Sequence, residues 1–454
     1  MTGVPNGLDR EVAPRDLFFS TTDRKGVIDG ANHVFSRYSR MEMDELLDAP
    51  HNVVRHPDIP GGLFRITWDL LRSGYPMAGY IKSLASDGVG YWVFATMTPL
   101  GDGYLSVRQR PCRTDLFAAA TGLYQTVAPK EKAWRAAGSS RAQAAKSGAD
   151  ELTAGIASLG AASYQDFIRE VVPAEVAARR ALTSWTGPDP RDPGSGLTQD
   201  LVDAAIAVDR ALDARMASLD ELGALSGELA RTQAETGEVL DRLRDAVSSA
   251  AAASHAVSDT WPVLGRVVEP LTEISQWLCD AIEQLDARLG EVREAIAELR
   301  LRTALARLHD EMLAEFAREV AAGDAPDRAP LYVHQLCRAL EEAATTAGRG
   351  LTLTHEGLRT LARDLGEVQT QTRTFQRQLA TWRLLIPRYG LSRQLDPFTR
   401  PIDGQLNSGL RQIGALREIV AQCQAVAQPV DDAPMTAAIG AVTAARIQVE
   451  QLSR

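Results

Sequence analysis

The segment from Pro50 to Pro60 (PHNVVRHPDIP) gathers the side chains best suited to gripping a ligand. Two imidazoles, a guanidinium, an amide and a carboxylate occupy eight positions: His51, Asn52, Arg55, His56 and Asp58. Pro57 and Pro60 prevent a continuous helix, so the pattern predicts an irregular loop. Polar groups on a loop between rigid elements are typical of binding sites. The alternative is a self-contained turn, in which Arg55 pairs with Asp58 and the histidines act as caps.

The same residues offer little to a metal ion. His51 and His56 stand five positions apart, with Asp58 nearby, but no fourth ligand follows at a spacing typical of zinc sites. The four cysteines are scattered singly and form no CxxC pair: Cys112, Cys279, Cys337 and Cys423. We therefore expect no metal site and no disulfide framework, and a reducing cytoplasm as the location.

Signals for enzymes are weak. His309 lies in a helical stretch (LARLHDEML), as a phosphate-accepting histidine would, but no proline follows it and no glycine-rich nucleotide-binding segment lies downstream. Neither GxSxG nor GxxxxGK[ST] occurs, and nothing resembles the GGDEF or EAL motifs of cyclic-dinucleotide enzymes. We expect a protein that is not an enzyme.

Charge and hydropathy exclude other classes. The net charge of 49 − 59 = −10 and the mixing of basic with acidic residues argue against nucleic-acid binding. No run of 18 uncharged apolar residues is present, so we expect no membrane insertion, and the first residues do not read as a secretory signal.

The elements that must position the Pro50–Pro60 loop lie before residue 118. Half of the 26 aromatic residues (7 Trp, 9 Tyr and 10 Phe) fall there, which favours a sheet. The patterns predict strands over 16–23, 26–32, 77–85, 90–100 and 103–110, and helices over 31–38, 41–47 and 62–73. The last three strands read as an antiparallel meander, and the helices between the second and third strands would cover one face.

The rest of the chain reads as helical. Breaks are expected at residues 138–140 and 147–148, and residues 187–196 (GPDPRDPGSG) read as a linker. Two heptad seams, Ile274–Leu299 and Leu358–Trp382, flank a turn at 321–330 and predict an antiparallel hairpin of helices about 50 residues long. Prolines 387, 397 and 401 should end its second arm, and a shorter helix should follow over about 405–426. Each seam could be an intramolecular core or also part of a homodimer interface.

These patterns divide the chain into a flexible tail (1–15), an α+β domain (16–118), a helical connector (119–200), a helical bundle or hairpin (201–428) and a C-terminal helix (429–454).

Three strings place the first domain in a known class. STTDRKGVIDGANHVF, PHNVVRHPDIP and GYWVFATMTPL, within about residues 16–113, resemble the PAS sensor domain of bacterial aerotaxis receptors. The resemblance implies a five-stranded antiparallel sheet with flanking helices, which binds FAD non-covalently and reads redox state as a proxy for oxygen. Residues matching flavin-binding positions are Asn32, Arg55, His56 and Asp58. His51, Asn52, Trp68 and Trp92 also match the pattern.

The sequence departs from that family at Met77, where the family pattern has a tryptophan. A methionine could still pack on a ring through its sulfur. An isoalloxazine ring needs an apolar slot with aromatic neighbours, and a diphosphate needs arginine, lysine or backbone N–H groups. Haem is the less favoured cofactor, with His33, His51 or His56 as the axial ligand.

The helical half contains no membrane anchor and lacks the hairpin-tip sequence of chemoreceptors, so coupling to a chemotaxis kinase is open. The sequence therefore predicts a cytoplasmic signal-transduction protein. It would sense redox state or oxygen through FAD and transmit the signal through a helical bundle. The alternative is a cofactor-free PAS and coiled-coil scaffold for partner proteins or for a homodimer.

Overall fold

The structure, a computed structural model, describes residues 3–183, 197–323, 328–428 and 431–452. The chain forms two compact units. We call the first the sheet unit; it comprises Met1–Arg215, Glu298–Gly348 and Asp431–Arg454. The second, the helical unit, comprises Met216–Ala297 and Arg349–Val430. These units do not follow the linear divisions at residues 118, 200 and 428, because helical segments distant in sequence pack with the sheet.

Five antiparallel strands form the sheet, in the order β4-β5-β6-β2-β3. They are β2 (Phe18–Asp23), β3 (Ile28–Ala31), β4 (Met77–Leu84), β5 (Gly90–Leu100) and β6 (Gly103–Gln109). Together with the helices around them and the all-helical remainder, they confirm the predicted fold class. The resemblance to PAS domains implied the same number and sense of strands.

The N-terminal residues add a sixth strand. In the structure β1 (Asp9–Arg10) pairs in parallel with the start of β5, and the backbone N–H of Gly90 donates to Leu8 at 2.8 Å. Val12 is buried. Part of the segment expected to be a flexible tail, residues 1–15, is therefore hydrogen-bonded to the sheet. Two residues of strand carry too little periodicity to be recognised in a sequence.

One face of the sheet is covered by the segment between β3 and β4. It contains α1 (His33–Ser39), α2 (Met43–Leu46), the short 3₁₀ helix η1 (His51–Val54) and α3 (Gly61–Arg72). Phe18 of β2 stacks on Phe35 and Tyr38 of α1, with ring centroids 5.9 and 5.5 Å apart. We call this the inner face, because the loop rich in polar residues lies over it.

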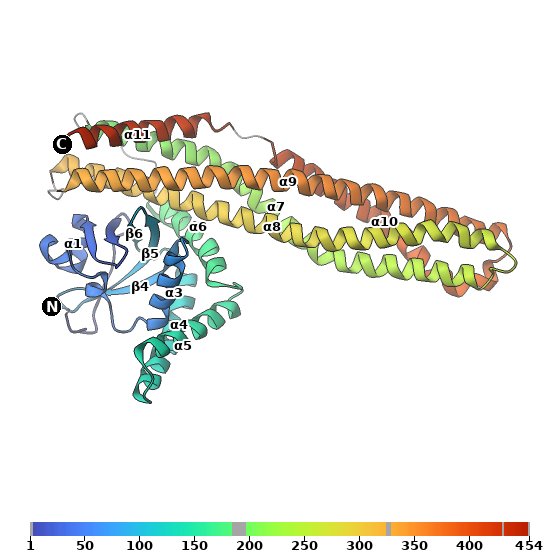
Figure 1. The fold of residues 1–454 in the computed structure, drawn as a ribbon, viewed down its shortest axis with the longest axis horizontal. Coiled ribbons are helices and arrows are strands. Elements are labelled where there is room, and N and C mark those ends of the chain that lie inside the picture. Colours follow the sequence, from blue (N-terminus) through green and yellow to red (C-terminus); the bar gives the residue numbers. More distant parts are fainter. Residues whose placement is uncertain (1–2, 184–196, 324–327, 429–430, 453–454) are drawn as a thin grey trace. The chain divides into compact units, whose positions relative to one another are not determined.

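Helices from later in the chain cover the opposite, outer face of the sheet (Figure 1). They include α4 (Thr114–Ala136), α6 (Tyr164–Thr183), and the ends of α8 (Pro262–Ala322) and α9 (Ala329–Arg388) that belong to the sheet unit. The Trp92 ring on β5 meets Phe117 of α4 at 5.2 Å, and the Phe19 ring on β2 meets Phe316 of α8 at 5.3 Å. Aromatic burial on this face holds the sheet to the helices.

The break expected at residues 138–140 is present, and the one expected at 147–148 is wrong. Ser140 caps α5 (Arg141–Ser158) by accepting from the N–H of Gln143 at 3.2 Å. Gly148 lies inside that helix, where a Cβ atom would overlap the Glu131 carboxylate of α4. The glycine therefore allows close packing rather than ending the helix. The expected linker, residues 187–196, lies outside the described residues.

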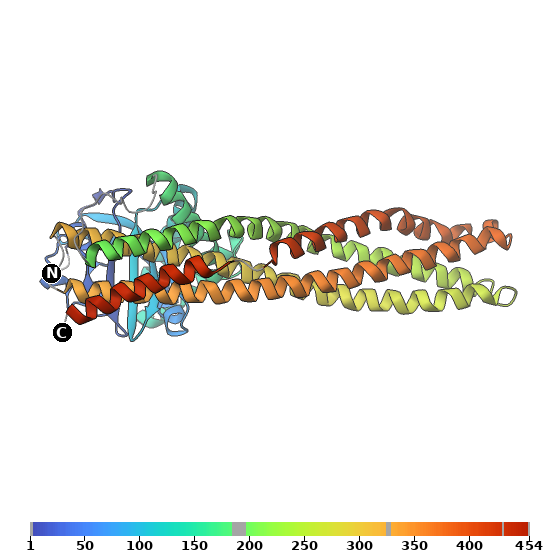
Figure 2. The same ribbon diagram turned by 90° about the horizontal axis from the view of Figure 1, so that it is seen from above.

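Within the sheet unit, α11 (Ala433–Leu452) lies along α9 (Figure 2). The guanidinium of Arg446 is 3.1 Å from the carboxylate of Glu341, and His334 Nδ1 is 2.8 Å from Glu450. The segment expected to form a separate C-terminal helix thus packs within the sheet unit.

The helical unit is built from parts of α7 (Leu197–His255), α8, α9 and α10 (Ser392–Val426). Both predicted seams are buried there: Leu278, Leu285 and Leu289 in the first, Leu361, Leu365 and Trp382 in the second. Their burial supports the intramolecular reading of the seams. None of the helices in the described ranges has both the length and the low charge that a membrane span requires.

The start of α10 corrects one expectation. The sequence predicts that prolines 397 and 401 precede a helix starting near residue 405, but α10 begins at Ser392 and contains both prolines. Both prolines lie beyond the first turn of α10, where the N–H of Leu395 already donates to Leu391 at 3.0 Å, so each removes one helical hydrogen bond. Leu395 and Ile402 are fully buried, and their burial offsets the hydrogen bonds lost at the two prolines. The centre of the expected turn at 321–330 lies outside the described residues.

Candidate functional site

A cavity of about 550 Å³ lies within the sheet unit, over the inner face of the sheet. This volume is in the range of small-molecule sites. The lining residues come from the β2–β3 turn, η1, α3 and the three long strands: Arg24, Lys25, Gly26, Pro50, His51, Asn52, Val54, Arg55, Phe64, Thr67, Trp68, Arg72, Ile81, Ser83, Ala95, Met97, Ser106 and Arg108.

Strand alternation builds the floor of the cavity. Successive side chains of a strand point to opposite faces, so Ala95 and Met97 of β5, and Ser106 and Arg108 of β6, share the inner face. Ala95 and Ser106 are small, which leaves room above them for a ligand. The alternation along β5 and β6 therefore places both large and small side chains under the cavity.

Four of the predicted site residues line this cavity: His51, Asn52, Arg55 and Trp68. The Arg55 guanidinium donates to the carbonyl of Ile59 at 3.1 Å and lies 4.1 Å from the centroid of the Phe64 ring. Partial burial lowers its pKa. In this geometry Arg55 is held by a carbonyl and a ring, which differs from the pairing with Asp58 that a self-contained turn would have.

Trp68 forms part of the cavity wall. Its ring meets Tyr104 edge-on at 5.8 Å, and the β2–β3 turn packs against it. Gly26 in that turn has a φ of 80°, and a Cβ atom there would lie 2.9 Å from the indole. Glycine is thus required both by the backbone conformation and by the closeness of the ring.

The other predicted site residues do not line the cavity: Asn32, His56, Asp58, Met77 and Trp92. His56 is buried, and its Nδ1 accepts from the N–H of Asp58 at 3.2 Å. This contact is local to the loop, and it is the part of the predicted self-contained turn, a histidine acting as a cap, that the structure contains. Trp92 lies on the outer face against α4, and Met77 is fully buried at the start of β4.

Asn32 joins the sheet to α8. Its side-chain oxygen accepts from the N–H of Phe19 at 3.2 Å, and its amide donates to the carboxylate of Glu319 at 2.8 Å. Burial raises the pKa of Glu319 to about 7. Asn32 stands at the N-terminus of α1, so it links a helix of the inner face to α8.

Arg108 is the residue that sequence reasoning missed. Its side chain is 3% exposed, it lines the cavity, and its Nη2 donates to Ser20 Oγ at 3.0 Å. A second contact joins Nη2 to Nε2 of His51, and the guanidinium lies 4.7 Å from the centroid of Phe35. Nη1 has no hydrogen-bond partner among the described residues. Alternation along GYLSVRQR could have placed this arginine on the inner face.

Burial in the cavity shifts both members of the Arg108–His51 contact. The pKa of Arg108 falls to about 10, and that of His51 falls to about 3 through loss of hydration and the nearby guanidinium. His51 is therefore neutral near pH 7. Because arginine can only donate, Nε2 of His51 accepts, and its lone pair is already used.

The cavity is strongly cationic. Five of its lining residues carry positive charge (Arg24, Lys25, Arg55, Arg72 and Arg108), whereas none of the described lining residues carries a carboxylate. Arg24 lies 3.3 Å from Asp102 and Arg72 lies 3.7 Å from Asp69, but these pairs are largely exposed and weak. The site is suited to an anionic ligand.

Haem and metal ions fit the cavity poorly. Of the three histidines considered for haem, His33 is exposed on α1 and His56 lies outside the cavity, while Nε2 of His51 faces Arg108. An axial ligand needs a free nitrogen lone pair. Across the described ranges, no group of three or more metal-ligating side chains comes together.

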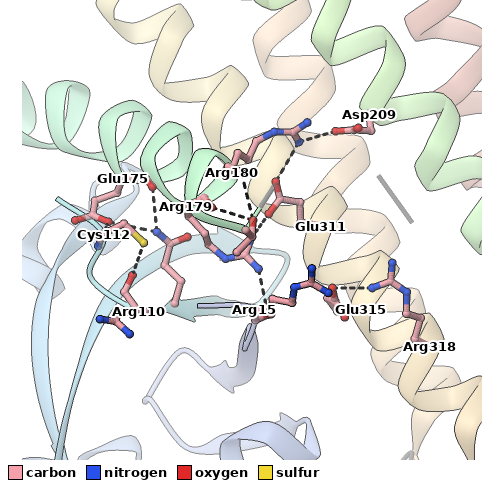
Figure 3. Close-up of polar contacts among 12 residues, drawn as sticks. Arg15, Arg110, Cys112, Glu175, Arg179, Arg180, Asp209, Glu311, Glu315 and Arg318 are labelled. Carbon is pink, nitrogen blue, oxygen red and sulfur yellow. Dashed lines mark hydrogen bonds and ion pairs between the residues drawn. The ribbon is translucent and has the colours of Figure 1, made fainter. Parts of the chain in front are cut away.

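A second polar cluster joins α6, α7 and α8 (Figure 3). The guanidinium of Arg179, 1% exposed, pairs with the carboxylate of Glu311. Arg180 reaches Glu311 at 3.1 Å and Asp209 at 2.7 Å. We call these four residues the arginine–acid cluster. No local pattern in the sequence indicates this cluster, because its members come from three separate helices.

Glu175 of α6 holds the junction between β6 and α4 (Figure 3). Its carboxylate accepts from the N–H groups of Cys112 and Arg113 at 2.8 and 2.9 Å, and from the Tyr80 hydroxyl at 2.7 Å. The segment by which the chain leaves the sheet is therefore fixed by one fully buried carboxylate.

Comparison with known proteins places the N-terminal part of the chain. Over 121 residues it is 37% identical to the aerotaxis receptor of Escherichia coli (strain K12), which makes this part a homologue of that protein. The match covers 26% of this chain and 24% of the receptor, so the chain spans about a quarter of its relative's length. No family model matches the chain.

Proposed function

We propose that the sheet unit binds FAD in its cavity and senses redox state or oxygen, as part of a signal-transduction protein related to chemotaxis receptors. The observation that carries this proposal is the surplus of positive charge around the cavity, with the buried guanidinium of Arg108 lacking an acidic partner among the described residues. The similarity to an aerotaxis receptor over the N-terminal part supports the same function.

The residues present suit both ends of FAD. Phe64, Trp68 and Ile81 are half-buried and offer an apolar wall to the ring. The exposed rim carries the cations that would hold the diphosphate: Arg24, Lys25, Arg55 and Arg72. Met77 lies outside the cavity, so its difference from the family's tryptophan does not remove a wall.

Bound FAD would supply the ability to accept and donate electrons. The chain's own residues bind and shield it, and link it to the helices. One route runs from Arg108 to Phe35 of α1, and from Asn32 at the start of α1 to Glu319 of α8. Differences in ligand charge could bias these contacts.

The proposed role is sensing rather than catalysis. Ser83, Ser106 and Thr67 offer hydroxyls to the cavity, but a nucleophile needs a neighbouring base. His51 has its Nε2 occupied by Arg108 and is neutral, which makes it a poor base. The cytoplasmic location and the homodimer stay predictions.

Binding of FAD to the full chain tests the proposal. Protein purified without added cofactor would be examined by visible absorption, and apoprotein would be titrated with FAD and with riboflavin. We expect FAD to bind at least about tenfold more tightly, because rim cations contact its phosphates. The double variant R24Q/R72Q should lose most of that preference. Arg65→Gln, on the exposed side of α3, is the matched control.

A colourless protein that also fails to bind added FAD would contradict the proposal. It would favour the alternative, a cofactor-free scaffold. A Soret band in the absorption spectrum would instead indicate haem.

A further inference from the structure

We infer that Arg108 sets the redox preference of the cavity, favouring a bound ring in its reduced, negatively charged form over the neutral oxidised form. This inference rests on the proposed binding of FAD. It assigns to one residue, absent from the sequence motif, the tuning of the midpoint potential.

The first step is the state of Arg108 in the protein. Its guanidinium is buried, with the hydroxyl of Ser20, the ring nitrogen of His51 and the face of Phe35 as its neighbours. None of these is an anion, and Nη1 has no partner among the described residues. A buried charge without a counter-ion is costly, so the site gains most from a ligand that brings negative charge to it.

The second step is the orientation of the ligand. Arg24 and Arg72 at the rim have side chains 71% and 70% exposed, whereas Arg108 is 3% exposed. Phosphates retain hydration best at the exposed rim, and an aromatic ring gains most from the apolar interior. The ring is therefore the part of FAD that shares the interior with Arg108.

The third step is the chemistry of reduction. Reduction of a bound ring would take two electrons from a reduced electron carrier and one proton from water, with one N–H bond formed and C=N double bonds of the ring converted to single bonds. The product carries one negative charge, whereas uptake of a second proton would leave it neutral. A fixed cation nearby stabilises the charged product and disfavours the second proton.

Other titratable groups near Arg108 do not change their protonation in the pH range in which the charge of the reduced ring is tested. His51 from η1 has a pKa of about 3, and loss of hydration raises the pKa of Tyr91 from β5 to about 12. Phe18 of β2 and Phe35 of α1 do not ionise, and the rim cations keep their charge. Between about pH 5 and pH 6.5 the ring is the group whose protonation responds.

Midpoint potentials of the full chain, saturated with FAD and titrated with dithionite against reference dyes, test the inference. In Arg108→Met we expect the equilibrium constant for reduction to fall at least about tenfold, which is about 30 mV for a two-electron couple. Arg108→Lys should keep most of the wild-type value, because it keeps the charge. Arg65→Gln on the exposed side of α3 should leave the potential unchanged.

The outcomes separate the two proposals. If the wild-type chain binds no FAD, the proposed function and this inference both fail. If FAD binds and Arg108→Met has the wild-type potential, the inference is overturned while the proposed function stands.

If the Arg108 variants do not fold, the wild-type protein supplies the test through its pH dependence. Uptake of one proton per two electrons shifts the equilibrium tenfold per pH unit, about 30 mV, and supports the inference. A hundredfold shift, about 59 mV per pH unit, means that the ring takes two protons and overturns it.

Discussion

Two buried arginines in the sheet unit have opposite kinds of partner. Arg179, in the arginine–acid cluster, pairs with Glu311, which Arg180 contacts as well. Arg108, in the cavity, has a hydroxyl and a ring nitrogen as partners and no carboxylate in contact among the described residues. Both side chains are nearly inaccessible to water. The difference therefore lies in what neutralises the charge.

This difference distinguishes a charge that stabilises the fold from a charge that is available to a ligand. In the arginine–acid cluster the protein supplies its own counter-ions, so the charges hold α6, α7 and α8 together. In the cavity the protein supplies the cation and leaves the anion to a ligand. A buried arginine with no acid beside a cavity is hence a better marker of a binding site than burial alone.

Removing the counter-ion of Arg179 should leave it, like Arg108, buried without a carboxylate in direct contact, and should greatly lower the stability of the protein. In Glu311→Gln a buried guanidinium loses its anionic partner, and we expect the free energy of unfolding to fall by about 3–5 kcal/mol. Urea unfolding followed by circular dichroism measures it. Glu315→Gln, which removes a partly exposed pair with Arg318 on the same helix, should change it by about 0.5 kcal/mol or less. A loss below about 1 kcal/mol for Glu311→Gln would show that the cluster is not a structural ion pair.

Lowering the pH should reduce the free energy of unfolding through His51, the histidine that contacts Arg108 in the cavity. Its pKa is about 3 in the folded chain and near 6.5 when unfolded, so between these values the unfolded state binds the extra proton. The contribution of His51 to stability is complete above pH 6.5 and is lost as pH falls, by about 1.4 kcal/mol per pH unit. Unfolding at pH 6.5 and pH 5 should show a loss of about 2 kcal/mol from this residue.

His51→Gln should remove that part of the pH dependence, and His33→Gln, at an exposed position of α1, should not. His309, buried against the carbonyl of Ala339 with a pKa of about 4, adds a slope of the same sign. Glu319, with a raised pKa, adds one of the opposite sign. If the pH dependence of the unfolding free energy is the same in His51→Gln as in the wild type, His51 is not held in its neutral form beside Arg108.

Removing the arginine of the cavity should have the opposite sign to removing an acid of the cluster. In Arg108→Met a buried charge without an anion is replaced by an apolar side chain of similar length, and we expect apoprotein to gain about 1–2 kcal/mol in unfolding free energy. Thermal unfolding with and without FAD would show a higher apoprotein Tm and a smaller shift on adding FAD. A clear destabilisation of the apoprotein would instead show that Arg108 is a structural residue like Arg179.

The smallest change in stability is expected from a substitution that acts on the N-terminus of α3. This helix carries the cavity residues Trp68 and Arg72. The Glu131 carboxylate accepts from the N–H groups of Gly61 and Gly62 at 2.6 and 2.8 Å. Glu131→Gln keeps an acceptor but loses the charge, so we expect a loss of about 1 kcal/mol in stability. Glu151→Gln, in an exposed pair with Lys130, is the control. Equal effects of the two substitutions would argue against a cap.

The elements with local signals were predictable from the sequence. The predicted bounds of β5 match the structure, and those of β4 and β6 differ by one residue, because alternating side chains and the glycines at turns act over a few residues. Four residues that match the family's pattern also line the cavity: His51, Asn52, Arg55 and Trp68.

Features that depend on distant contacts were not predictable. The resemblance matches Asn32 to a flavin-binding position, whereas in the structure this residue lies outside the cavity lining and its amide donates to Glu319 of α8. The sequence pattern predicts a helix break at Gly148. It does not show that the Glu131 carboxylate of α4 occupies the position that a side chain at residue 148 would take. Arg108 lies on a readily predicted strand, yet its importance comes from the acids that are missing around it.

The pairing of the sheet with α8 has a consequence for how the chain is made. Phe19 packs on Phe316, and 287 residues separate Asn32 from Glu319. At about 5–20 residues per second, a ribosome needs about 15–60 s to add that many residues. During this time the apolar side chains in the part of the outer face that α8 covers, Phe19 among them, remain exposed. The nascent chain should therefore depend on chaperones that hold exposed sheet surface until translation reaches α8.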